Sequence, residues 1–401
     1  MSLALSSRRA VLAPGPWVRN ELWRRARAVP SLDLRFAENK SLRDAVTGQS
    51  LITFTRASSA TYVDSAGVIR TATTDEARFD HSTTNGESLG LLVEELRVNR
   101  LLYNRTLTNA AWVATGITAA KDQTGADGVS SGASSITATA GNGTILQTIT
   151  SASAARATSA YVKRITGTGT IQMTQDNGST WTSVTVTSGW TRVTIPSATV
   201  TNPVVGFRIV TSGDAIAVDY VQCEDGAFST SAISETTTAT VTRSADVASI
   251  SGAAFSGWYR QDEFTAYVDA RLLSNTSATS KHLFMVSDGT GDNRIAIFGP
   301  ASGGLSTFRQ TGAGANQTIL LASVTPNVSI KTACAFTASD SAGSVNGGTS
   351  IAIGNVAMPV GVDRFGLWRT YGTTDPSNAH IARVTFWPRR LGNEVLQSIT
   401  R

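Results

Sequence analysis

The chain has 401 residues, of which 41% are hydrophobic and 16% are charged, whereas about 25% are charged in an average domain. The chain contains 35 glycines and many Thr, Ser and Ala residues in place of charged ones. This composition excludes a coiled coil, a collagen-like rod and a charge-driven disordered chain. At roughly 150 residues per domain the length suggests two to four domains, and the frequent β-branched residues predict an all-β, multi-domain fold.

Membrane insertion and secretion are not indicated. No apolar run approaches the ~18 residues that a membrane span needs, and Arg8 and Arg9 interrupt the first apolar stretch, which argues against a secretory signal. The two cysteines, Cys223 and Cys334, are compatible with one long disulfide or with two buried thiols, and we expect thiols.

Residues 1–30 form a basic segment that we expect to act as an anchoring arm. This segment contains six arginines and one acidic residue, Glu21, so its net charge of +5 equals the net charge of the whole chain. The rest of the chain is therefore neutral on balance, and nucleic-acid binding is not indicated. A short helix is predicted between Pro16 and Pro30. Two readings stay open: the helix docks on the protein's own first domain, or it docks on a partner through Trp17, Trp23, Arg24, Arg25 and Arg27.

Residues 31–109 read as a small β-rich attachment region. Short alternating segments lie at 51–56 and 67–70, and a hairpin turn is expected at 64–67. This stretch has few hydrophobic residues, so we expect it to lean on its neighbours.

Two β-sandwiches are expected to follow, because short alternating segments recur with turns between them. The first, at 110–240, reads as a jelly roll with strands such as 145–149, 159–163 and 215–222. The second, at 241–401, has strand candidates such as 263–270 and 379–387 and a short helix at 393–399.

No catalytic constellation stands out. His81, His282 and His380 lie in separate strand contexts and read as ordinary surface or edge residues, and the sequence contains no nucleophile elbow, Walker loop or zinc motif. Carboxylate pairs for glycoside hydrolysis cannot be assembled from the sequence. We therefore expect a non-enzymatic protein.

The sequence offers two weaker candidates for ligand sites. The segment 287–293 offers Asp288, Asp292 and Asn293 as oxygen ligands for Ca²⁺, although such a loop is more often a plain turn; no other cofactor is expected. Sugar rings stack on exposed aromatics, and Trp181, Trp190, Trp258 and Trp368 are the candidates, although a tryptophan in a sandwich more often fills the core.

Several segments resemble parts of tailed-bacteriophage virion proteins. Residues 54–70, 77–81 and 90–99 look like a module shared by such proteins, and residues 221–234 and 241–246 are similar to the closing strand of their carbohydrate-binding-module-like jelly rolls. The ending, residues 379–391, resembles the last strand of concanavalin- or laminin-G-like sandwiches. The chain lacks the β-helix repeat of depolymerase tailspikes and the collagen-like or coiled-coil shaft of long fibres.

The resemblance implies a structural component of a phage particle, of the tail-fibre, tailspike or head-fibre type, made in the host cytoplasm. It further implies other virion proteins and a host-surface glycan as partners, and a homotrimer. A glycan-cleaving tailspike enzyme and a purely architectural decoration protein without a ligand are the alternatives.

Overall fold

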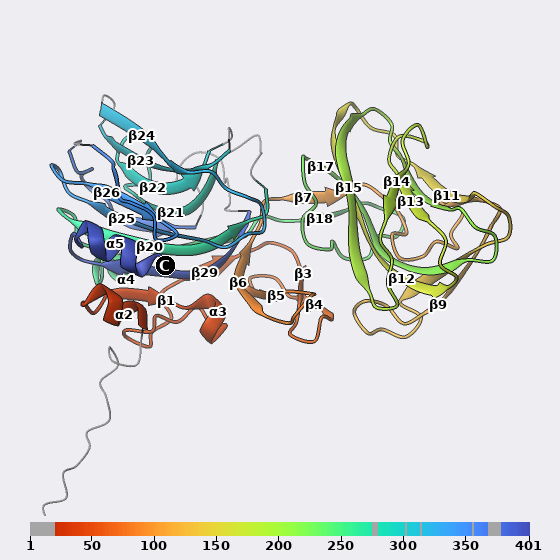
Figure 1. Ribbon diagram of the computed structural model, residues 1–401, viewed down its shortest axis with the longest axis horizontal. Coiled ribbons are helices and arrows are strands. Elements are labelled where there is room, and N and C mark those ends of the chain that lie inside the picture. Colours follow the sequence, from red (N-terminus) through yellow and green to blue (C-terminus); the bar gives the residue numbers. More distant parts are fainter. Residues whose placement is uncertain (1–20, 275–279, 301–302, 313–314, 355–356, 368–377) are drawn as a thin grey trace, which may run out of the picture.

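The computed structural model describes residues 21–274, 280–300, 303–312, 315–354, 357–367 and 378–401. Strands dominate these ranges and build two β-sandwiches that lie side by side along the long axis of the molecule (Figure 1). The predicted all-β, multi-domain class is confirmed. We call the sandwich that contains the C-terminus the large lobe and the other the inserted lobe.

The large lobe consists of two antiparallel sheets. Sheet 1 contains, in order, β27 (Ile351–Ala352), β26 (Ala342–Val345), β25 (Ile330–Phe336), β20 (Phe264–Leu272), β29 (Ala379–Trp387), β6 (Ser88–Val93) and β5 (Arg78–His81), and β1 (Leu32–Leu34) also pairs with β29. Sheet 2 contains β2 (Thr53–Thr55), β19 (Val247–Ser251), β28 (Arg364–Gly366), β21 (Lys281–Ser287), β22 (Arg294–Gly299), β23 (Leu305–Thr311) and β24 (Ala315–Ala322).

Strand β20 shows why sheet 1 is covered on both faces. Its alternate residues, among them Phe264 and Val268, enter the core between the two sheets, whereas Tyr267 faces the other way and packs with helices α2 (Glu21–Ala26) and α5 (Asn393–Ile399). Because successive strand side chains point to opposite faces, a strand that is covered on both sides buries residues of both faces, as β20 does over most of its length.

The prediction of a separate region at 31–109 is wrong for most of the strands up to Val93. Strands β1, β2, β5 and β6 are members of the large lobe's sheets, pairing with β29 and β19 or, for β5, with β6. Such short, sparsely apolar strands cannot bury a core of their own, so they complete sheets whose other strands come from the last third of the chain.

The inserted lobe is a jelly-roll-like sandwich. One sheet contains β15 (Thr191–Val200), β12 (Ala154–Thr166), β17 (Ala215–Asp225), β10 (Ala133–Ala138) and β9 (Ile117–Gln123), and the other contains β14 (Thr182–Val184), β13 (Ile171–Thr174), β16 (Val204–Ile209), β11 (Gly143–Thr148) and β8 (Val113–Thr115). Its core includes Trp112, Ile136 and Phe207 and shares no residue with the core of the large lobe.

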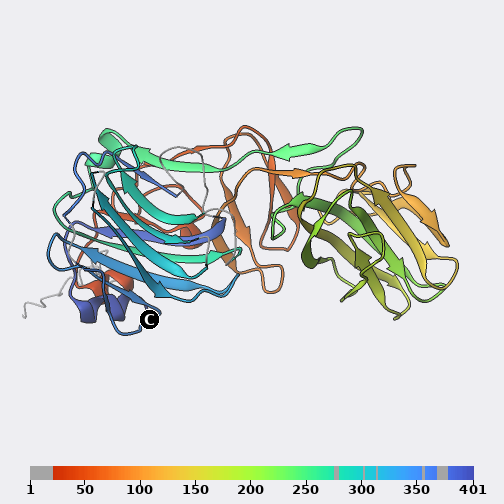
Figure 2. The same cartoon turned by 90° about the horizontal axis from the view of Figure 1, so that it is seen from above.

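The two lobes are joined where the chain leaves and re-enters the large lobe. Strand β7 (Arg97–Asn99) leads out and β18 (Val241–Arg243) leads back, and the two pair antiparallel with Asn99 opposite Val241 (Figures 1 and 2). The jelly roll is therefore an insertion between two neighbouring strands. A small hairpin, β3 (Ala60–Val63) with β4 (Ile69–Ala72), lies beside this junction.

Two further helices, α3 (Phe36–Asn39) and α4 (Ala253–Ser256), lie on the large lobe, and α5 covers the range 393–399 that the sequence predicted as a short helix. Both cysteines are free and buried, as expected, and burial raises the pKa of Cys223 to about 11 and that of Cys334 to about 12. Within the described ranges, none of the helices has the length and hydropathy needed to cross a membrane.

Candidate functional site at the junction of the lobes

A buried network of charged side chains lies at the junction. It consists of Arg56, Arg78, Glu94, Arg243 and Asp246, which we call the junction network, and each residue is at most 1% exposed. Arg56 Nη1 lies 3.0 Å from Asp246 Oδ1, and Arg78 bonds to the other oxygen of the same carboxylate. Glu94 Oε2 lies 2.8 Å from Arg78 Nη1 and 2.7 Å from Arg243 Nη1.

Burial and pairing act against each other in this network. Desolvation is the largest influence on Glu94 and opposes its charge, yet Arg243, Arg78 and Ser231 together hold its pKa well below the ordinary range. For Arg56 and Arg243 the desolvation prevails, and their pKa values are lowered. A charge this deeply buried is tolerated only while its partners stay in place, so the network fixes the geometry of the segments that meet here.

The network also ties the inserted lobe to the large lobe. The segment after β17 returns from the jelly roll, and there Ser231 donates from its backbone N–H to Glu94 Oε1 at 2.7 Å and from its hydroxyl to Glu94 Oε2 at 2.6 Å. On the way out, Asn99 Nδ2 donates to the Val221 carbonyl of β17 at 3.0 Å. Polar contacts thus hold both connections between the lobes.

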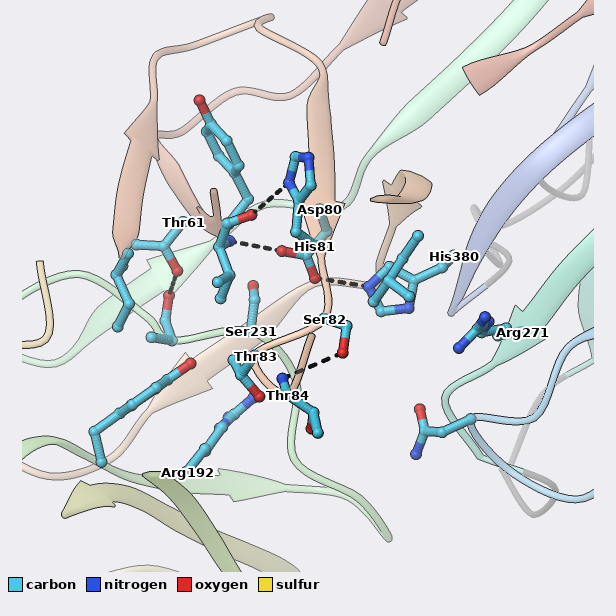
Figure 3. Close-up of a pocket in the computed structure, with 17 residues that line it drawn as sticks. Thr61, Asp80, His81, Ser82, Thr83, Thr84, Arg192, Ser231, Arg271 and His380 are labelled. Atoms are coloured by element: carbon cyan, nitrogen blue, oxygen red, sulfur yellow. Dashed lines mark hydrogen bonds and ion pairs between the residues drawn. The ribbon is translucent and has the colours of Figure 1, made fainter. Parts of the chain in front are cut away.

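A cavity of about 390 Å³ opens beside this network, between the two lobes. Figure 3 shows it with its lining side chains. The large lobe and the small hairpin contribute one part of the lining, and the inserted lobe contributes Tyr161 from β12 and Arg192 from β15. Residues 231–232, which connect the lobes, complete the wall.

Asp80 and His380 form a close pair in this cavity. His380 Nε2 lies 2.7 Å from Asp80 Oδ2, and the Val63 backbone N–H donates to Asp80 Oδ1 at 2.6 Å (Figure 3). Because a carboxylate accepts hydrogen bonds, Nε2 carries the proton that joins the pair. Strands β29 and β5 and the hairpin are held together at this point.

His81 presents an unused acceptor. Its Nδ1 lies 3.0 Å from the Val63 carbonyl oxygen, which can only accept, so Nδ1 is the donor. In the neutral ring Nε2 is then an acceptor, and it is buried without a hydrogen-bond partner among the described residues. A buried polar atom without a partner is costly.

The wall from the inserted lobe combines an aromatic ring with a cation. Tyr161 is 5% exposed, and burial raises its pKa. The Arg192 guanidinium carbon lies 5.9 Å from the centre of its ring, and Arg192 Nη2 donates to Ser159 Oγ at 3.0 Å and to the Thr230 carbonyl. Arg192 is thereby held in position at the cavity wall.

The opposite wall carries a second arginine. Arg271 of β20 is about a third exposed, and its Nη2 lies 3.9 Å from Glu87 Oε1. Figure 3 shows Arg192 and Arg271 on opposite sides of the turn Ser82–Thr84, whose hydroxyl side chains also line the cavity. Asp80 is the one acidic residue among the described residues of the lining. The cavity therefore offers guanidinium donors, hydroxyl groups and one carboxylate that is already paired with His380.

The structure changes the reading of the arm. The prediction that Trp23 contacts a partner is wrong: the side chain is 4% exposed, packs with Tyr267 and Trp387, and donates from Nε1 to Asp33 Oδ2 at 2.9 Å. Arg25 Nη1 lies 3.2 Å from the Ser398 carbonyl of α5. Arg24 and Arg27 are exposed and stay available to a partner. Trp17 lies outside the described residues.

The tryptophans proposed as sugar platforms differ from one another. Trp258 is 4% exposed and packs edge-on against Phe255, Phe365 and Phe386, so its assignment as a platform is wrong. Trp181 and Trp190 are half-buried, with Arg208 4.4 Å from the ring centre of the first and Lys163 Nζ 5.0 Å from that of the second. Trp368 lies outside the described residues.

The candidate calcium loop is organised as a turn. Asp288 N donates to the Asn293 carbonyl, Asn293 Nδ2 donates to Asp288 Oδ2 at 2.9 Å, and Asp292 is exposed. In the ranges that the structure describes, no group of three His, Cys, Asp or Glu residues is placed to hold a metal ion. Calcium binding by this loop stays a prediction.

Sequence reasoning missed the residues that line the cavity. His81 and His380 were expected to be ordinary surface or edge residues, but both are less than a tenth exposed and line the same cavity. Asp80 and His380 are separated by 300 positions, so their spacing carries no signal. The one usable hint was chemical: Arg78, Asp80 and His81 concentrate polar groups in a strand of four residues.

Comparison with known proteins adds a likeness in structure. No protein-family model and no curated protein sequence matches the chain. Solved structures that match include the CBM40 of the Ruminococcus gnavus IT-sialidase, with a TM-score of 0.31, 18% identity, and coverage of 35% of this chain and 84% of that chain. A Trypanosoma rangeli sialidase in complex with the inhibitor DANA matches with a TM-score of 0.32 and 12% identity, over 38% of this chain and 26% of that chain. The chain thus spans about a quarter of that sialidase, and at these identities the likeness concerns the fold alone.

Proposed function

We propose that the chain is a non-enzymatic component of a tailed-phage particle that binds a glycan of the host surface in the cavity between its two lobes. The observation that carries the glycan part is the lining of this cavity, which combines two arginines with a row of hydroxyl groups. Sugars present many hydroxyl groups, and guanidinium and hydroxyl side chains are suited to hydrogen-bond with them.

The phage part rests on the sequence resemblance. The segments that resemble virion proteins supply all five residues of the junction network: Arg56, Arg78, Glu94, Arg243 and Asp246. The segments with this resemblance therefore meet at the junction network, beside the cavity. A homotrimer is part of the same proposal. Three linked copies would bind a glycan-coated surface more tightly than a single weak site does, because several sites engage together. Detection of the chain in purified particles tests this part.

Retention on an array of bacterial capsular and lipopolysaccharide O-chain polysaccharides tests glycan binding. Thr83 is exposed at the turn that lines the cavity, so Thr83→Trp fills the space without disturbing a core. We expect this variant to lose binding by at least about tenfold, equivalent to ~1.4 kcal/mol. Asn85→Trp, exposed in the same turn but outside the cavity lining, is the matched control. A blank array for the unaltered protein contradicts glycan binding and favours an architectural part.

Glycan cleavage is the rival function. The common mechanism needs two carboxyl groups that flank the scissile bond, whereas the described lining supplies Asp80, whose two oxygens already bind His380 and Val63. We therefore expect no new reducing ends when the protein is incubated with a polysaccharide that it retains. Their appearance would overturn the non-enzymatic assignment.

A further inference from the structure

A second cavity of about 440 Å³ lies next to the first. Asn327 lines both cavities. The walls also continue from one to the other: Arg271 of the large lobe lines the first and Leu273 the second, while on the inserted lobe Arg192 lines the first and Thr194 the second. Both cavities therefore belong to the same interface between the lobes.

Strand β15 forms a continuous wall along the two cavities. Val193 is buried in the core of the inserted lobe, so its neighbours Arg192 and Thr194 share the opposite face and line the first and the second cavity. Exposed Pro196 and Ser197, which follow on the same strand, also line the second cavity. At ~3.3 Å per residue, the four steps from Arg192 to Pro196 span roughly 13 Å. This length exceeds one sugar ring and accommodates a short chain of them.

The second cavity has the chemistry of an uncharged sugar site. Its described lining contains hydroxyl groups, the exposed amide of Asn327 and the aromatic ring of Phe228, and it contains no Asp, Glu, Lys or Arg. The guanidinium carbon of Arg97 lies 4.9 Å from the centre of the Phe228 ring, which fixes that ring in place. Charged contacts are thus confined to the first cavity.

We propose that the two cavities act as one groove that binds an extended oligosaccharide, with its polar or charged unit in the first cavity and neutral units along β15 in the second. This inference rests on the proposed function, because it assumes that the first cavity binds a glycan. It adds that the bound ligand is a chain of several sugars and identifies the residues that contact its extension.

An extended peptide is the competing occupant, since β15 is the edge strand of its sheet. Two features disfavour regular pairing with a peptide. Pro196 has no N–H to donate, and the register between β12 and β15 shifts in the segment that contains Pro196. Side chains of the groove, rather than the backbone of its edge, are therefore expected to make the contacts.

The test uses size-fractionated fragments of a polysaccharide that the unaltered protein retains on the array, measured by titration calorimetry. We expect affinity to rise by roughly tenfold from the shortest fragment that binds to fragments several sugars longer. Ser197→Trp, an exposed change in the second cavity, should abolish this gain and leave the affinity for the shortest fragment unchanged. Thr199→Trp, exposed further along β15 and outside both linings, is the matched control.

The outcomes separate the two claims. Equal affinity for short and long fragments, or a length effect that survives Ser197→Trp, overturns the extended groove while glycan binding stands. Failure of every polysaccharide to bind overturns the proposed function and the groove with it. Binding that Thr83→Trp leaves intact but Ser197→Trp removes places the ligand, peptide or sugar, in the second cavity alone and contradicts the single groove.

Discussion

At the scale of single residues, the junction shows how buried charge specifies a unique arrangement. Glu94 contacts two arginines and both polar groups of Ser231. Replacing such a group with an apolar one of the same size is tolerated in some proteins, but removing one partner leaves the others unpaired in the interior. The energetic role of the network is therefore seen most clearly when one member loses its charge.

Glu94→Gln tests this role. We expect a loss of about 3–5 kcal/mol in the free energy of unfolding at neutral pH, since Arg78 and Arg243 lose a buried counter-charge. The folded state lowers the pKa of Glu94 below its ordinary value of 4.5, so its contribution is complete above that value and declines as the pH falls below it. Urea unfolding at neutral pH and at about pH 3 should show the difference between the two proteins shrinking in acid. Glu394→Gln, an exposed change, should show neither effect.

At the scale of elements, α2 illustrates how a basic segment can be part of a core. Leu22, Trp23 and Ala26 are buried against sheet 1 and α5, while Arg24 and Arg27 remain exposed. The helical spacing of the apolar residues was visible in the sequence. The surface that receives them was not, because β25 and α5 come from the far end of the chain.

Trp23→Ala should lower the free energy of unfolding by about 3–5 kcal/mol, the usual cost of emptying a buried aromatic site. The change also removes the hydrogen bond to Asp33. Arg24→Ala, exposed in the same helix, should stay within about 0.5 kcal/mol of the unaltered protein in chemical denaturation. Unchanged stability of the Trp23 variant, combined with lost incorporation into particles, would restore the reading of Trp23 as a partner contact.

At the scale of the whole molecule, the large lobe is assembled from both ends of the chain and the jelly roll is inserted between them. Its sheets need β1, β2, β5 and β6 from the first hundred residues and the remaining strands from residues after 246. The inserted lobe has a core of its own. The large lobe is therefore built from two separate stretches of sequence, whereas the inserted lobe is built from one continuous stretch.

A shortened chain tests this organisation. Residues 21–99 joined to 241–401 by an Asn-Gly turn should unfold cooperatively in urea, because Asn99 and Val241 are already paired and a two-residue turn fits such a hairpin. Residues 241–401 alone should fail to do so, since both sheets lose strands to which β29 and β19 pair. Cooperative unfolding of that fragment would show that the first hundred residues are dispensable.

The fold class followed from the alternation of apolar and polar residues, which is local and therefore visible in sequence. Strand pairing is not local: the weak strands at 53–55 and 88–93 gave no sign that they join β19 and β29. The site depends on the same long-range pairing, since His380 reaches Asp80 only through the contact of β29 with β6. Aromatic content pointed to Trp258 as a platform, but burial in the core decided otherwise.

Because β7 and β18 lie side by side, evolution can exchange the jelly roll between them for another domain. Exchange of the jelly roll for another one requires only two breakpoints, which lie beside each other in space, so the recipient lobe keeps its folding and its Asp80–His380 pair. Half of the groove would then be new, namely the part contributed by β12 and β15, while the other half stays constant. Recombination at β7 and β18 would change which glycan the groove selects and leave the sheets of the large lobe as they are.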